Sequence, residues 1–319
     1  MDQLTIPAWT RPTGFLFSEP VTQLPDRADV AFLGIPYGGA YSFHEIVNDQ
    51  ANGARAMREA SDRIVRSLER YDFDLGGPLY DGRAIRAVDC GDVRGSVDDR
   101  HAHKARAEQA VRHLLKAGAL PIILGGDHSI PIPVLRAYAD HGPITVVQID
   151  AHIDWRDEIN GVRDGLSSPM RRASEMQHVG PLFQIGLRAT GSAREEEVAA
   201  ARAYGADLIT AYELHESGMQ AILDRIPDGG RYYLTVDMDG MDPSDAPGVA
   251  APCPGGVTFL QARQLIRGLV RKGRVVGMDV VEITPSRDIN RLTCITAGRL
   301  IVNLIGAAVR AGYFDRPHA

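Results

Sequence analysis

Short apolar runs alternate along the chain with longer segments in which apolar residues recur every three or four positions. The short runs are bounded by Gly, Pro or Asp, which is typical of buried strands, and they lie at residues 30–33, 85–88, 121–124, 144–149, 182–185, 207–209, 232–236 and 275–281. The segments with helical spacing lie at residues 51–68, 104–117, 193–203, 214–225, 260–272 and 292–311. Because the two kinds of element alternate, the pattern predicts an α/β fold with a mostly parallel sheet covered by helices on both faces.

Charged residues directly follow four of the predicted strands. The groups are Gly125-Gly126-Asp127-His128-Ser129, Asp150-Ala151-His152-Ile153-Asp154, Asp237-Met238-Asp239 and Glu282. Ligands of an open parallel sheet bind beyond the carboxyl ends of its strands. We therefore expect these groups to meet at one edge of the sheet.

Four carboxylates and two imidazoles can face one point in this arrangement. Side chains alternate along an extended chain, so residues 150, 152 and 154 point the same way, and so do residues 237 and 239. Negative charge of this density beside apolar strands is costly unless cations neutralise it. Oxygen and nitrogen donors without a thiolate suit Mn²⁺, with Ni²⁺, Co²⁺ or Fe²⁺ as alternatives. The candidate metal ligands are His128, Asp150, His152, Asp154, Asp237 and Asp239.

Two ions account for this donor set better than one. Six ligands exceed what a single ion uses while one coordination position stays open, whereas two bridging aspartates would hold a pair of ions about 3.5–4 Å apart with a shared hydroxide. Taken singly, each motif has a structural explanation, because an isolated Asp-x-Asp is usually a cap or a turn, and Asp127 or Ser129 could cap a helix. Their occurrence together, at successive strand ends, favours the metal site.

Length and composition agree with one large enzyme domain. With 319 residues, of which 44% are hydrophobic, the chain can bury a large core. We expect a single catalytic domain over residues 29–319. Residues 1–28 contain four prolines and are expected to form an extended arm over the surface or onto a neighbour.

Several classes of protein are disfavoured. No uninterrupted apolar stretch reaches the roughly 18 residues of a membrane span, and the chain start lacks the pattern of a signal peptide, so we expect a cytoplasmic protein without a membrane partner. Cys90, Cys253 and Cys294 are too few and too scattered for a disulfide framework. A net charge of −6 without a Lys or Arg cluster argues against nucleic-acid binding. A small cation or neutral molecule is the expected partner.

The strand-end motifs resemble the three signature motifs of the ureohydrolases, the arginase and agmatinase superfamily. Further matches in the same order are Gly34-Ile35-Pro36, Ala246-Pro247-Gly248, Pro254-Gly255-Gly256 and Val280-Val281-Glu282-Ile283-Thr284-Pro285. The resemblance covers most of the chain and is closer to the agmatinase branch than to arginase. It implies a three-layer α/β/α sandwich with an eight-stranded mostly parallel sheet, two Mn²⁺ ions per subunit, a homotrimer or homohexamer, and hydrolysis of a guanidino group to urea and an amine.

The resemblance also implies roles for individual residues. One ion would take His128, Asp150, Asp154 and Asp237, and the other Asp150, His152, Asp237 and Asp239, with Asp150 and Asp237 as bridges. The catalytic residues would be Asp154, which would move a proton to the departing amine, and Glu282, which would bind the guanidinium through a bidentate charge-assisted pair.

The chain departs from the family pattern after the Asp150–Asp154 run. Many members have a histidine there, whereas this chain has Gly165-Leu166-Ser167-Ser168. Ser167, Asp154, water or His44 would then have to move the proton. The loops over residues 37–52, 155–168 and 242–256 are expected to form the substrate pocket, and the substrate-binding candidates are Glu282, Tyr41, His44, Asn160 and Ser167.

The pocket loops do not decide the substrate. Their acidic residues suit a cationic tail such as that of agmatine, whereas Arg156 and Arg163 suit a carboxylate such as that of guanidinobutyrate. Trp155 either closes over a small substrate or packs in the interior.

Agmatine is the favoured substrate, with guanidinobutyrate, guanidinopropionate, guanidine and a substituted guanidine or biguanide as alternatives. Two other classes of protein were considered. A non-catalytic subunit of a hetero-oligomer should have lost metal ligands, and all six are kept here. A one-metal deacetylase of related fold would not need both bridging aspartates.

Overall fold

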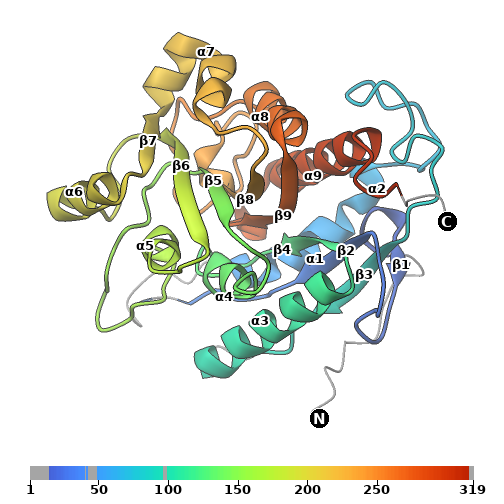
Figure 1. Ribbon diagram of the computed structural model, residues 1–319, viewed down its shortest axis with the longest axis horizontal. Coiled ribbons are helices and arrows are strands. Elements are labelled where there is room, and N and C mark those ends of the chain that lie inside the picture. The colour runs from blue at the N-terminus through green and yellow to red at the C-terminus, as the bar shows by residue number, and fades with distance from the viewer. Residues whose placement is uncertain (1–13, 40, 42–48, 96–98, 316–319) are drawn as a thin grey trace.

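The described residues form a nine-stranded sheet, which lies in the middle of the molecule (Figure 1). The computed structural model describes residues 14–39, 41, 49–95 and 99–315. The sheet order is β1-β3-β2-β4-β9-β8-β5-β6-β7, and all of its neighbouring strands run parallel. The strands are β1 (Glu19–Pro20), β2 (Val30–Gly34), β3 (Ala87–Asp92), β4 (Leu120–Leu124), β5 (Ile144–Ile149), β6 (Val179–Leu187), β7 (Asp207–Thr210), β8 (Arg231–Asp237) and β9 (Arg274–Val281).

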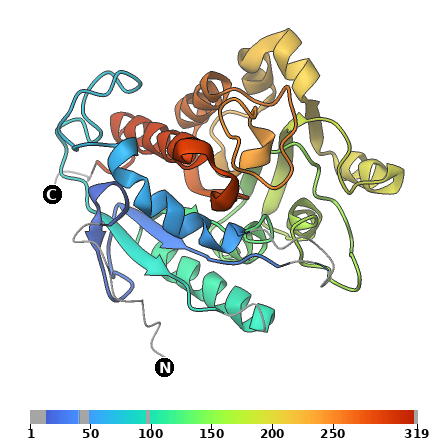
Figure 2. The same ribbon diagram turned by 180° about the vertical axis from the view of Figure 1, so that it is seen from behind.

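Helices cover both faces of the sheet, which gives the predicted three layers (Figures 1 and 2). One layer consists of α1 (Gly53–Glu59), α2 (Ser61–Ile64), α7 (Ala211–Arg225), α8 (Phe259–Lys272) and α9 (Leu292–Arg310). The other consists of α3 (Arg100–Lys116), α4 (Pro131–Arg136), α5 (Pro169–Ser174) and α6 (Glu195–Tyr204). Along β2, Val30 and Phe32 pack in the first layer, whereas Ala31 and Leu33 pack in the second. The alternation of side chains across the sheet therefore divides the core in two.

The α/β fold is confirmed, but the expected strand number of eight is wrong by one. The additional strand is β1, a two-residue edge strand that pairs with β3. It contains Pro20, which cannot donate a ladder hydrogen bond and is tolerated at an edge. A strand this short has no apolar run that a sequence pattern could detect.

Part of the segment that was expected to be an arm packs against the domain. The side chains of Phe15 and Leu16 are fully buried. The amide of Phe15 donates to Asp89 over 2.8 Å, and that of Leu16 donates to Ser61 over 2.6 Å. Residues 1–13 lie outside the described residues, so the arm stays a prediction for them.

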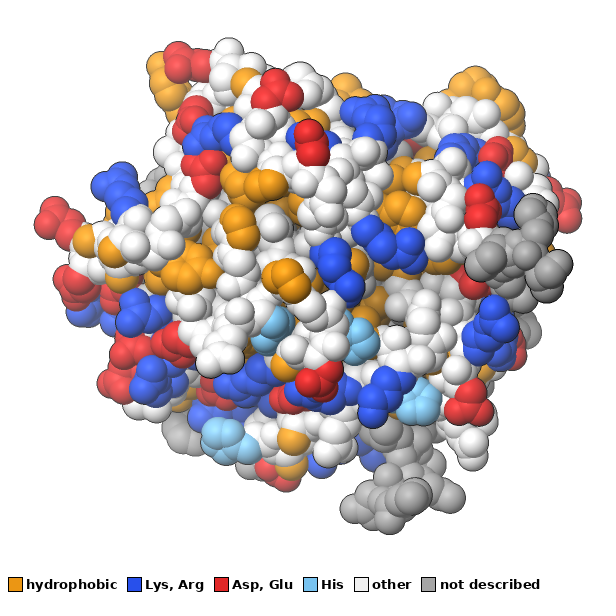
Figure 3. All heavy atoms as spheres, viewed as in Figure 1, with side chains coloured by type: hydrophobic (Ala, Val, Ile, Leu, Met, Phe, Trp, Pro, Cys, Tyr) orange, Lys and Arg blue, Asp and Glu red, His pale blue; other side chains and the backbone are white. Residues whose placement is uncertain are grey.

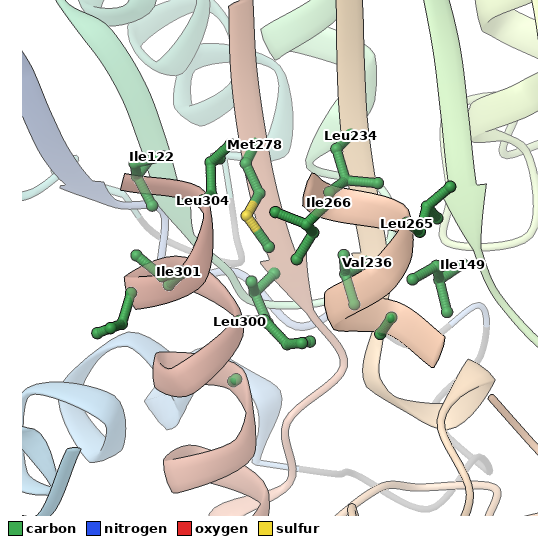
Figure 4. Close-up of a cluster of buried hydrophobic side chains, with 14 of the residues drawn as sticks. Ile122, Ile149, Leu234, Val236, Leu265, Ile266, Met278, Leu300, Ile301 and Leu304 are labelled. Atoms are coloured by element: carbon green, nitrogen blue, oxygen red, sulfur yellow. The ribbon is translucent and has the colours of Figure 1, made fainter. Parts of the chain in front are cut away.

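The helix α9 is the main apolar element of its layer (Figure 4). The segment Ile289–Arg310 is long and apolar enough to cross a membrane, with a mean hydropathy of 1.7 over a stretch of 18 residues, but 78% of that stretch is buried inside the protein. Figure 4 shows Leu300, Ile301 and Leu304 of this helix facing Ile122 and Met278 of the sheet. The apolar surface of α9 is thus used to cover the sheet.

Charges are mixed on the surface. On the face shown in Figure 3, acidic and basic side chains of the described residues lie interspersed, and hydrophobic side chains form separate small patches.

Shortening a core side chain of α9 should destabilise the protein strongly. Leu300 is fully buried, so Leu300→Ala is expected to lower the free energy of unfolding by about 2–5 kcal/mol, through lost apolar contact and a residual cavity. Leu260, whose exposure is 71%, provides the control, because Leu260→Ala should change stability by less than about 0.5 kcal/mol. Urea denaturation of the metal-free protein measures both changes, and equal effects would contradict this description of the core.

Candidate metal centre

The strand register brings the predicted ligands to one edge of the sheet. Leu124, Val280, Val236 and Ile149 form one row across the adjacent strands β4, β9, β8 and β5. The chain beyond this row carries the polar motifs. Each motif therefore begins at the same level of the sheet, although the motifs lie far apart in the sequence.

Three carboxylates converge on the His128 ring. The Nδ1 atom of His128 lies 2.8 Å from Asp154 Oδ2, 3.0 Å from Asp150 Oδ2 and 3.0 Å from Asp237 Oδ2. Two donors at adjacent positions of an octahedral ion, each about 2.1 Å from it, are roughly 3 Å apart. The spacing of this first donor group is thus that of ligands around a common cation.

A second donor group shares Asp150 with the first. The Nδ1 atom of His152 lies 3.5 Å from Asp150 Oδ1 and 3.3 Å from Asp239 Oδ2. One oxygen of Asp150 faces His128 and the other faces His152, so this carboxylate lies between the two groups. The His152 side chain is 26% exposed, whereas those of His128 and Asp150 are almost fully buried. The second group is therefore the more accessible to solvent.

Hydrogen bonds fix which nitrogen of His128 faces the carboxylates. The Thr235 hydroxyl donates to Asp279 over 2.7 Å, so it accepts from Nε2 of His128, 3.1 Å away. Tyr233 holds the other oxygen of Asp279 over 2.6 Å. With the proton on Nε2, the lone pair of Nδ1 is directed at the donor group, as a metal ligand requires.

A chain of buried amides orients Asp150. The indole of Trp155 donates to Gln184 over 2.7 Å, and Gln184 donates to Gln148 over 2.5 Å. Gln148 in turn donates to Asp150 Oδ2 over 2.5 Å. Trp155 is thus a residue that packs in the interior and does not close over a substrate.

Crowding shifts the protonation of the carboxyl groups. Burial and the neighbouring Asp150 raise the pKa of Asp154 from its ordinary value of 3.8 to about 7. Burial, with Asp239 and Asp150, raises the pKa of Asp237 well above its usual range. Burial lowers the pKa of His152, but hydrogen bonds to Asp150 and Asp239 outweigh it and raise that pKa to about 12. The cluster holds protons because its negative charges lack sufficient compensation.

Two buried atoms at the centre lack hydrogen-bond partners among the described residues. They are His128 Nδ1 and Asp154 Oδ2, which approach each other without hydrogen-bond geometry. Buried polar atoms are rarely left in this state unless an ion or water satisfies them. Oxygen-rich donors, charge, spacing and these unsatisfied atoms all fit divalent cations, and the structure brings together all six predicted ligands.

The two residues predicted as catalytic have unusual backbone conformations. Asp154 has a φ of 50° and Glu282 a φ of 64°, in the left-handed region that non-glycine residues seldom adopt. Such strain is concentrated at functional sites. Glu282 Oε1 accepts from the amide of His128 over 2.7 Å, and Oε2 accepts from the side chain of Gln50 over 2.9 Å. This carboxylate is therefore held beside the metal ligands.

The other described substrate-binding candidates lie in different parts of the molecule. The amide of Ser167 donates to the Tyr41 hydroxyl over 2.8 Å, so these two candidates lie together. Asn160, with a φ of 52°, precedes Gly161 in a two-residue turn closed by hydrogen bonds between Ile159 and Val162. Asn160 is exposed, and no described contact joins it to the donor groups. His44 lies outside the described residues.

Several residues that hold the site were not singled out from the sequence. They are Gln50, Gln148, Gln184, Arg188, Tyr233, Thr235 and Asp279. Gln148, Gln184, Thr235 and Asp279 are fully buried in strands that are mostly apolar. A polar residue in such a strand needs a buried partner, and this signal could have identified them.

Known proteins share both the sequence and the fold. The family model of the arginase family matches residues 28–306 of this chain. N(1)-aminopropylagmatine ureohydrolase of Thermus thermophilus is 32% identical, over 91% of this chain and 94% of that protein. Guanidinopropionase of Pseudomonas aeruginosa is 33% identical, over 88% of this chain and 87% of that protein.

A solved structure extends the comparison to three dimensions. The structure of proclavaminate amidino hydrolase from Streptomyces clavuligerus superposes with a TM-score of 0.82 and 29% identity, over 96% of this chain and 99% of that chain. The chain therefore belongs to the arginase family, the metal-dependent hydrolases that act on guanidino groups.

Proposed function

We propose that this protein hydrolyses agmatine to putrescine and urea with the help of two Mn²⁺ ions. His128, Asp150, Asp154 and Asp237 would hold one ion, and Asp150, His152, Asp237 and Asp239 the other. Divalent cations at this site supply positive charge and make a water-derived nucleophile available near neutral pH. Mn²⁺ is preferred because the donors are carboxylate oxygens and imidazole nitrogens, and Ni²⁺ or Co²⁺ suits the same set.

Glu282 is suited to bind the guanidinium. Its carboxylate accepts from two neutral donors, the His128 amide and the Gln50 side chain, and no cationic side chain of the described residues pairs with it. Each carboxylate oxygen has a further lone pair that a planar, permanently charged guanidinium can use. Such a pair fixes the orientation of the guanidino carbon, and orientation contributes much of the rate in reactions of this kind.

Asp154 is suited to move the proton to the departing amine. Its Oδ2 is buried and has no hydrogen-bond partner among the described residues. Its backbone carbonyl accepts from the amide of Arg171 over 3.2 Å, which fixes the start of the following loop. A carboxyl group held in one place can deliver a proton repeatedly to the same leaving group.

The choice of agmatine depends on where the positive charges of the pocket loops lie. The segments 37–49 and 242–256 contain no Lys or Arg. In the third loop, Arg156 lies 3.1 Å from Glu197, and Arg163 lies 2.9 Å from Asp157. Both arginines already have a carboxylate partner within the protein, which favours the carboxylate of a guanidino acid less, whereas the ammonium group of agmatine needs no cationic partner.

A urea-release assay tests this proposal. The Mn²⁺-loaded and the Ni²⁺-loaded protein are compared on agmatine, guanidinobutyrate, guanidinopropionate, guanidine and a biguanide. Agmatine is expected to have the highest kcat/KM. A preference for either acid would contradict the assignment of the substrate, and no urea from any compound would contradict the proposed activity.

Removing the shared carboxylate of Asp237 should strongly weaken metal binding at the centre. Asp237→Asn removes a negative charge that faces His128 Nδ1 at 3.0 Å, so both the Mn²⁺ content and the urea-forming activity are expected to fall by at least roughly tenfold. Elemental analysis after dialysis and the urea assay measure these changes. Wild-type turnover by this variant would refute the role of Asp237.

Neutralising Glu282 should affect the substrate and not the metal. Glu282→Gln is expected to lower kcat/KM by roughly 10- to 150-fold, equivalent to about 1.5–3 kcal/mol of a hydrogen bond to a charged group, while two Mn²⁺ ions per chain remain. Glu216→Gln, at an exposed position of α7, is the matched control and should keep wild-type kinetics. Unchanged kinetics in the Glu282 variant would exclude it as the guanidinium-binding residue.

The metal-free protein should lose stability as the pH rises. The pKa of Asp154 is raised to about 7 and that of Glu282 to about 8, in both cases mainly by burial. The folded state then binds more protons than the unfolded state above about pH 4, and this difference lowers the free energy of unfolding with increasing pH. The raised pKa of His152 acts in the same direction above pH 6.5.

Calorimetry with and without a chelator measures this dependence. The Tm of the metal-free protein is expected to fall between pH 5.5 and pH 8. Added Mn²⁺ should raise the Tm more at pH 8 than at pH 5.5, since the cation replaces bound protons. A Tm that rises with pH in the metal-free protein would contradict the charge crowding described above.

A further inference from the structure

Arg188 extends its guanidinium beneath the loop that carries Asp239. It follows β6 directly and is partly buried. Its Nη1 donates to Gly186 O over 3.0 Å and to Gly240 O over 3.1 Å. Its Nη2 donates to Asp239 O over 2.7 Å and to Met241 O over 3.1 Å. Nε and Nη2 both donate to Cys253 O, over 3.1 Å and 2.7 Å.

These contacts use the whole hydrogen-bonding capacity of the side chain. A guanidinium has five N–H groups in a planar fork, and here they meet five carbonyl oxygens. The cation therefore has no donor left for a substrate carboxylate. Its hydrogen bonds instead hold two segments of the main chain in place. These are the turn Met238–Gly240 (η4) and the loop around Cys253.

The turn η4 depends on such support because it lies beyond the last ladder pair of β8. That pair joins Asp237 to Val281, and the carbonyls of residues 239–241 come after it. The same turn packs against the other metal-bearing loop, because a Cβ atom at Gly240 would lie 2.5 Å from the amide nitrogen of Asp150. A displacement of η4 would thus move Asp239 away from its partners His152 and Asp150.

The two donor groups are supported by different residues. His128, in the first group, is oriented by Thr235 and Asp279. Asp150 Oδ2, which faces His128, is held by Gln148. The described hydrogen bonds of the Arg188 side chain reach none of these side chains and instead reach the main chain that carries Asp239. Substitution of Arg188 is therefore expected to displace mainly the ligands of the second donor group.

We propose that Arg188 is a positioning residue that sets the affinity of the second cation, the ion that Asp150, His152, Asp237 and Asp239 would hold. The inference rests on the proposed two-ion function. It assigns to Arg188 a role in assembling the centre and none in contacting the substrate.

Metal counting on two variants tests this role. Mn²⁺ binding is measured by equilibrium dialysis on the full chain, with no substrate present. The wild type is expected to bind two ions per chain. Arg188→Met should keep the first ion and bind the second 10- to 100-fold more weakly, the range typical for residues that orient metal ligands. Arg188→Lys should be intermediate or similar, because three donors on one nitrogen cannot span five carbonyls.

Arg310 provides a matched control. Its guanidinium also donates to main-chain carbonyls, those of Pro78, Leu79 and Gly306, at the far end of α9. Arg310→Met is expected to lower the Tm and still bind two ions with wild-type affinity. A general loss of stability is thereby separated from a selective loss of one ion.

The outcomes separate this inference from the proposed function. Two ions bound with wild-type affinity by both Arg188 variants would overturn the positioning role, and so would an equal weakening of both ions. If Arg188→Met does not fold, the Lys variant decides in the same way. A wild type that binds two ions but releases no urea would contradict the proposed function alone.

Discussion

Negative charge is concentrated at the carboxyl edge of a buried parallel sheet, and this concentration governs the arrangement of the residues around it. Asp150, Asp154 and Asp237 lie within 3.0 Å of one imidazole nitrogen, in an interior that excludes most water. Without cations, such a cluster keeps protons that isolated carboxylates would release. Divalent cations would neutralise this negative charge. The same carboxylates that are unfavourable together in the metal-free cluster would make the site selective for such cations.

The fold brings the candidate metal ligands together, and buried polar residues orient their side chains. Parallel strands in register bring the ends of β4, β9, β8 and β5 to one level, so that short motifs distant in sequence meet there. Side chains that contact no substrate then fix the ligands: Thr235 acts on His128, and Gln148 acts on Asp150. A binuclear centre needs both, because a ligand displaced by even about 1 Å no longer coordinates well.

The sequence predicted the longer strands and the meeting of the polar motifs at one edge of the sheet, for definite physical reasons. Short apolar runs bounded by Gly, Pro or Asp predicted the eight longer strands, and the rule that sites lie at carboxyl ends placed His128 and Asp237 together. The two-residue strand β1 and the six-residue helices α4 and α5 were too short to show a period. One expected helix, over residues 51–68, is divided into α1 and α2, and the chain becomes extended at Val65. Contacts such as that between Gln50 and Glu282, 232 residues apart, have no local pattern.

Six side chains from three loops would together form one centre for two cations. Anomalous diffraction from crystals of the Mn²⁺-loaded protein tests it most directly. Two peaks are expected at the carboxyl edge of the sheet, one beside His128 and one beside His152, with Asp150 in contact with both. A single peak, or peaks away from Asp150, would contradict it.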